Sequence, residues 1–177
     1  MADSYRLTVL KRLTALLESI VPTAYGTPNQ MPAVMTGRVF RGRTLFGESD
    51  PETLLSILES PRSLGANFTN DNNVRKEDWQ LLIQGWTVDD KKHPSDPLYS
   101  LLDDVEVCLD RVVRLLGSNG EPKYPNDYLL GAALDGDGRL IASMQVGPCS
   151  VRPPTENLSS KCFFYVPVRV EIARIAS

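Results

Sequence analysis

The sequence predicts an α+β protein in which one mostly antiparallel sheet has two main helices packed on one side. Two segments, one near the N-terminus and one in the middle of the chain, repeat apolar residues every three or four positions, which is typical of one helical face. Other segments are short apolar runs or alternate apolar with polar residues, as strands do. Helices and strands do not alternate regularly, so we expect an antiparallel sheet rather than a parallel βαβ arrangement.

Length and composition indicate one ordinary folded domain. The chain has 177 residues, of which 42% are hydrophobic and 23% are charged, and both fractions are close to globular averages. No apolar stretch reaches the roughly 20 residues needed to cross a bilayer. A net charge of -3 argues against a general nucleic-acid binder. We therefore expect a single soluble domain over residues 1–177 with no membrane association.

The first helix is predicted between Tyr5 and Val21, with Asp3 or Ser4 as its cap. Pro22 is expected to end it, because proline lacks the amide hydrogen that a helix needs. The following segment, residues 22–35, is rich in proline and turn-forming residues. We expect an extended arm or loop there.

Three strand-like segments precede the middle of the chain. Residues 36–46 read as a strand or hairpin limb with a long basic edge, although two glycines favour a bend. The apolar runs 54–58 and 79–86 are expected to pair with each other. Between them, the polar residues 63–78 predict an exposed loop longer than the connections usual in compact domains.

The second helix has the clearest pattern in the chain. Asp96 is placed to cap it, Pro97 suits its first turn, and apolar residues recur at helical spacing from Leu98 to Leu116. Gly117 then supplies a stop signal. The sequence therefore predicts one long helix with a buried stripe.

Two strands are predicted near the C-terminus. Residues 140–146 form one of them, and residues 162–172 form the other, which alternates clearly between two faces. Pro167 cannot donate to a sheet ladder, so this strand should be an edge at that point or contain a bulge. The proline-rich connection, residues 147–160, is expected to be an extended loop able to lie on a neighbouring protein.

The residues that usually carry chemistry are scattered. His93, the single histidine, stands in a polar turn without a nucleophile or orienting carboxylate specified around it. The three cysteines, Cys108, Cys149 and Cys162, match neither zinc nor redox spacing. An Asp-Gly-Asp-Gly run from Asp135 lacks the glutamate that completes a calcium loop. We expect no enzyme activity, no cofactor and no metal.

The candidate interface residues are arginines and tryptophans in or beside predicted strands and loops. The basic cluster, formed by Arg38, Arg41 and Arg43, could bind the carboxylates of a neighbouring protein or, alternatively, the phosphates of DNA. Tryptophans can anchor a partner surface, but beside an apolar strand they are at least as often core residues. The candidates are Arg38, Arg41, Arg43, Trp79, Trp86 and Arg152.

Several stretches together resemble the tail terminator, or tail completion, proteins of tailed bacteriophages. The resemblance spans most of the chain. It lies in the order and general character of the stretches, and no catalytic motif is part of it. It is carried by residues 37–43 (Gly-Arg-Val-Phe-Arg-Gly-Arg), 54–62, 79–86 with Asp89 and Asp90, 94–99 (Pro-Ser-Asp-Pro-Leu-Tyr) and 163–170 (Phe-Phe-Tyr-Val-Pro-Val-Arg-Val).

This resemblance implies a virion protein of the tail and neck, assembled in the host cytoplasm. Such a protein forms a hexameric ring that caps the tail tube, stops its growth and joins the head-side connector. Its partners would be sister subunits, the tube protein, the connector or neck protein and, in a contractile tail, the sheath. DNA would pass through the lumen without specific binding. Two alternatives stay open, namely another neck or head-completion connector subunit and a small ligand-binding domain.

Overall fold

The structure is a computed structural model of the whole chain. It describes residues 4–23, 34–47, 49–60, 70–71, 74–87, 90, 92–116, 119–131, 138–153 and 161–175. Most of the predicted arm 22–35, part of the predicted loop 63–78, the Asp135 run and the second half of the connection 147–160 lie outside these residues.

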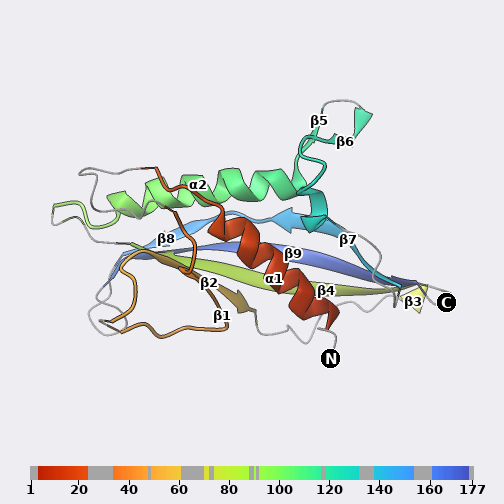
Figure 1. Cartoon of the computed structure of the whole chain (residues 1–177), viewed down its shortest axis with the longest axis horizontal. Helices are drawn as coiled ribbons and strands as arrows, with labels where there is room; N and C mark the ends of the chain where they lie inside the picture. Colours follow the sequence, from red (N-terminus) through yellow and green to blue (C-terminus); the bar gives the residue numbers. More distant parts are fainter. Residues whose placement is uncertain are drawn as a thin grey trace.

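Within the described residues, one mixed sheet of seven strands forms the base of the molecule (Figure 1). Its strands follow the order β1-β2-β4-β9-β7, with β3 paired to β4 and β8 paired to β9. Only β1 and β2 run parallel, and the other pairs are antiparallel. The strands are β1 (Val39–Arg41), β2 (Leu54–Glu59), β3 (Asn70–Asp71), β4 (Val74–Trp86), β7 (Arg139–Val146), β8 (Ser150–Arg152) and β9 (Phe163–Ile175).

Two helices, α1 (Tyr5–Glu18) and α2 (Asp96–Val113), bury their apolar stripes in one core with the sheet. The α+β class with two helices on a mostly antiparallel sheet is therefore confirmed. Ser4 caps α1 by accepting a hydrogen bond from the amide of Leu7 at 3.4 Å. The helix ends at Glu18, earlier than predicted and four residues before Pro22, because Ser19 closes its last turn.

Strand β9 lies in the interior of the sheet, between β4 on one side and β7 and β8 on the other, and its inward side chains line the core. Its inward residues are Phe164, Val166, Val168, Val170 and Ile172, all of them buried. They stand opposite inward residues of β4 in register, for example Val168 opposite Leu81. The predicted alternation of this strand is confirmed, and it continues as far as Ile175.

Pro167 is accommodated without making β9 an edge strand or bulging it. Its carbonyl accepts from the amide of Gly147 at 2.8 Å, so its amide nitrogen also points toward the chain between β7 and β8. That chain leaves the sheet at this point, between Val146 and Ser150. The missing donor of Pro167 therefore faces a place where the ladder is already interrupted.

Several boundaries differ from the sequence predictions. Residues 74–78 belong to β4 instead of a loop, because they pair with the far end of β9. Ser150–Arg152 pairs with β9 as β8, although its proline-rich surroundings predicted an unpaired loop. The predicted strand 36–46 shortens to Val39–Arg41, since Gly42 turns the chain with a φ of 68°.

The second helix also ends before its predicted limit. Ser95, and not Asp96, is its cap residue, and the helix stops at Val113. Leu115–Leu116 then forms β5, which pairs with β6 (Glu121–Pro122) in a separate hairpin. This hairpin projects from the C-terminal end of α2, away from the sheet (Figure 1). A short 3₁₀ turn, η2 (Tyr128–Leu130), leads back to the body.

Candidate protein-interaction surface

The face of the sheet opposite the helices carries five aromatic side chains in contact with one another. On β4 the odd-numbered residues Trp79, Leu81 and Ile83 face the core, so Trp86 points to the other face, as does its partner Phe163 on β9. We call these five side chains the aromatic row. They are Phe40, Phe46, Trp86, Phe163 and Tyr165.

The aromatic row is continuous across the sheet. Ring centroids are 5.5 Å apart for Phe40 and Phe46, 4.8 Å for Phe46 and Trp86, 6.5 Å for Trp86 and Phe163, and 6.3 Å for Phe163 and Tyr165. All pairs are tilted, an arrangement that aromatic rings favour over face-to-face stacking. Trp86 is 8% exposed and forms the base of the row, while the other four rings are half-buried.

An arginine stands at each end of the aromatic row. The guanidinium carbon of Arg43 lies 5.0 Å from the ring centroid of Phe40 and 4.8 Å from that of Phe46. At the other end, the guanidinium of Arg152 lies 5.9 Å from the Tyr165 ring. All three distances suit cation–π attraction, which orients a charge over an aromatic face.

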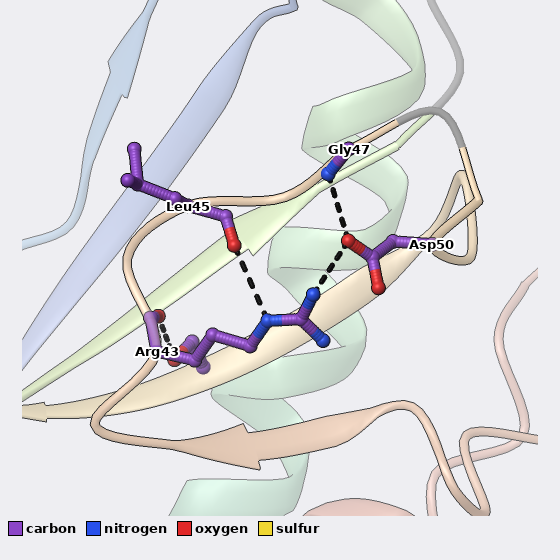
Figure 2. A network of polar contacts seen from close by, with 5 residues as sticks. Arg43, Leu45, Gly47 and Asp50 are labelled. Carbon is purple, nitrogen blue, oxygen red and sulfur yellow. Dashed lines mark hydrogen bonds and ion pairs between the residues drawn. The ribbon is translucent and has the colours of Figure 1, made fainter.

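The position of Arg43 is fixed by the loop between β1 and β2 (Figure 2). Its Nη2 donates to Oδ2 of Asp50 at 2.7 Å, and its Nε donates to the carbonyl of Leu45 at 3.2 Å. The amide of Gly47 donates to the same Asp50 oxygen at 2.7 Å. The hydrogen bond from Gly47, together with Arg43, holds the pKa of Asp50 below its usual value of 3.8.

Arg152 is placed by the pairing of β8 with β9, which sets it opposite Phe163. Its Nε donates to the phenolic oxygen of Tyr165 at 3.1 Å. This hydrogen bond lowers the pKa of Tyr165 below its usual value, because the guanidinium stabilises the phenolate. Arg152 is otherwise exposed, and no described carboxylate pairs with it.

The same face becomes polar toward the far end of β4 and β9. Arg169 binds Asp78 in a two-pronged pair, Nε to Oδ1 at 3.1 Å and Nη2 to Oδ2 at 2.5 Å. Lys76 pairs with Glu171 at 3.3 Å. These charges neutralise one another across the two strands, so this end of the face is polar, in contrast to the aromatic row.

Three of the six predicted interface residues, Arg43, Trp86 and Arg152, meet at the aromatic row. Arg38 is half-buried and donates to the carbonyl of Thr53 at 3.3 Å, which gives it a structural role. Arg41 is exposed on the edge strand β1. Its side chain makes no hydrogen bond or ion pair with another residue of the described part of the chain.

Trp79 lies in the core on the helix side, so it does not belong to this surface. Its indole nitrogen donates to Oε2 of Glu59 at 3.2 Å, and the guanidinium of Arg6 lies 5.1 Å from its ring. The core alternative for Trp79 is therefore the one observed. Trp79 and Trp86 are seven residues apart in one strand, an odd separation that places them on opposite faces.

Four members of the aromatic row, Phe40, Phe46, Phe163 and Tyr165, were not among the predicted interface residues. The alternation in β9 already placed Tyr165 opposite the buried face, and Phe163 has the same parity. Phe46 follows no strand period, because it reaches Trp86 from the loop after β1. Its place is decided by the hydrogen bonds around Arg43.

The remaining titratable candidates lie elsewhere. His93 is exposed, and its amide and that of Lys92 each donate to Oδ1 of Asp90 at 2.8 Å. The three cysteines form no disulfide with one another, and burial raises the pKa of Cys108 to about 11. Within the described part of the chain, no cluster of His, Cys, Asp and Glu is arranged to hold a metal ion.

No helix in the described ranges is both long enough and apolar enough to cross a membrane. Comparison with the models of known protein families gives no match. A search of curated proteins also finds no similar sequence.

Proposed function

We propose that this chain is an assembly protein that binds other proteins through the helix-free face of its sheet. The observation that carries the proposal is the aromatic row with an arginine at each end. Trp, Tyr and Arg are the residues most enriched at binding hot spots, because they combine a large apolar area with directed polar contacts. Preorganised rings and a fixed Arg43 would lose little conformational entropy on binding.

Among assembly proteins, we propose a phage tail terminator. The proposal draws on the sequence stretches that resemble that family, and three of them, residues 37–43, 79–86 and 163–170, contribute to the aromatic row. In this role the chain forms a ring at the head–tail joint of the virion, caps the tail tube and stops its growth. It would act without catalysis or cofactor, and DNA would pass through the ring without specific binding.

The test uses isolated tail tubes and the purified full chain, imaged by negative stain with solution mass measured in parallel. We expect six-fold rings or single caps at one end of each tube. Arg152→Glu should reduce capping, because it reverses the charge at one end of the aromatic row. Lys92→Glu, an exposed charge reversal in the turn before α2, is the matched control and should cap normally.

The other outcomes distinguish the alternatives. Binding to the portal-side connector with no affinity for tubes would replace the terminator with another neck subunit. A chain that stays monomeric and ignores both tubes and connectors would overturn the assembly proposal and favour a ligand-binding domain.

A further inference from the structure

The β5–β6 hairpin exposes apolar side chains on a projection from the body. Leu115 is 45% exposed and Leu116 is 49% exposed. Adjacent strand residues point to opposite faces, so the hairpin carries an apolar residue on both sides. Its base is attached firmly, since Arg111 pairs with Asp127 at 2.5 Å and its guanidinium stands 5.9 Å from the Tyr124 ring. An anchored hairpin that exposes apolar side chains on both faces is typical of an element that inserts into a partner protein.

A groove of about 830 Å³ runs between α2 and β7. Val107, one of the residues that line it, is 68% exposed. Val113 and Val146 add apolar surface, while Asp103, Glu106 and Asp110 add carboxylates. The groove therefore offers an apolar strip bordered by negative charge.

The charges of the groove and the hairpin are complementary. Asp103 and Glu106 have no cationic partner among the described residues. On the hairpin, the ammonium of Lys123 stands 5.3 Å from the Tyr124 ring and pairs with no described carboxylate. Arg114 adds a second cation, although Asp110 of the same chain already pairs with it at 3.3 Å. The groove thus lacks positive charge. The hairpin supplies two cations beside its apolar side chains, Lys123 and Arg114, against one exposed carboxylate, Glu121 on β6.

We infer that the β5–β6 hairpin of one copy docks into the α2–β7 groove of the next copy. This inference rests on the proposed ring and names the contact between its subunits. The contact joins two different patches, and repeated contacts of that kind produce a ring when the rotation between subunits closes. A hairpin covers less than the about 800 Å² per partner of a standard interface, so one contact is weak and ring closure strengthens the set.

The test is a cross-link between two differently marked copies of the full chain. Both carry Cys149→Ser, because the half-buried native thiol lies near the groove. One copy adds Leu116→Cys, the other adds Val107→Cys, and the mixture is oxidised with oxidised glutathione. We expect a mixed disulfide dimer, identified by mass, in at least tenfold higher yield than with Leu45→Cys in place of Leu116→Cys. Leu45 is a suitable control because it is 84% exposed and lies in the β1–β2 loop.

Equal yields in the test and control mixtures would overturn the inference. A second variant, Leu116→Asp, addresses the ring itself and should abolish caps on tubes while unfolding at the same temperature as the parent chain. If the parent chain caps tubes and Leu116→Asp caps them equally well, the hairpin contact is overturned and the terminator function stands. A specific cross-link without any capping would retain the contact and overturn the terminator function.

Discussion

The ring of Phe164 occupies the space that a side chain at Gly85 would need. A β-carbon on residue 85 would lie 2.5 Å from Cε1 of Phe164 and 2.9 Å from Cδ2 of Leu55. Gly85 and Phe164 are directly opposite in the β4–β9 pair. The glycine therefore admits a fully buried phenylalanine to the core, one residue before Trp86 turns to the opposite face.

Gly85→Ala should destabilise the protein by about 1–3 kcal/mol, because overpacking forces a buried ring and the backbone to shift. The free energy of unfolding in urea measures the loss. Gly47→Ala is the matched control, since no atom lies within 4 Å of a β-carbon there. Equal stability of both variants would mean that the Phe164 ring has room to move.

Leu109→Asp should prevent folding, because it places an unpaired carboxylate in the core at a cost of several kcal/mol. Leu109 is buried on the inner face of α2, whereas Val107 on the same helix is exposed. Val107→Asp is therefore the control and should fold with little loss of stability. Circular dichroism and thermal unfolding distinguish the two, and a cooperatively folded Leu109→Asp protein would contradict the assignment of the buried stripe.

Asp50 should contribute to stability above its ordinary pKa and lose that contribution in acid. Its pKa is lower in the folded protein than the 3.8 of an unperturbed aspartate, so the unfolded chain takes up the proton first as the pH falls. The stabilisation is therefore complete well above pH 4 and disappears as the pH falls through the lowered folded value.

Asp50→Asn should consequently lower the melting temperature at pH 7. Near pH 3 the melting temperature of the variant should approach that of the parent protein. Glu52→Gln, which changes an exposed carboxylate two residues away, is the control and should follow the parent at both pH values. If the difference in melting temperature between Asp50→Asn and the parent protein stays constant from pH 7 to pH 3, the ionised carboxylate of Asp50 does not stabilise this loop.

The native protein should show one accessible thiol. Cys149 is half-buried, whereas Cys108 and Cys162 are buried, and the pKa of Cys108 is about 11. A maleimide at pH 7 should label one site in the folded protein and three after unfolding, as counted by mass spectrometry. Cys149→Ser should abolish the native labelling. Rapid labelling of Cys108 would indicate that α2 opens locally.

Charge reversal at Arg41 or Arg43 should weaken capping of tail tubes. Arg41 is exposed without a described side-chain contact, so Arg41→Glu should act on assembly and leave the melting temperature unchanged. Arg43→Glu should also lower the melting temperature, because it places a second carboxylate against Asp50. Normal capping by both variants would remove Arg41 and Arg43 from the proposed interface.

Local patterns accounted for the elements that make mostly local or strictly periodic contacts. The stripe of α2 and the alternation of β9 could be predicted because burial of one face imposes a period on the residues themselves. The end of α2 was predicted too late, since Leu115 and Leu116 continue the helical spacing but pair with Glu121–Pro122 instead. The spacing of apolar residues does not show whether another segment competes for the backbone hydrogen bonds of a helix end.

The sequence by itself determined the α+β class, the two helices, the alternating strand near the C-terminus and the pairing of residues 54–58 with 79–86. The tertiary structure decided that β1 runs parallel to β2 and that β8 joins the sheet. It also brought Arg43 and Arg152, 109 positions apart, to the two ends of one aromatic row. The physical reason is that strand partners are chosen by contacts between distant segments, whose free energy depends on the packed core and not on any local repeat.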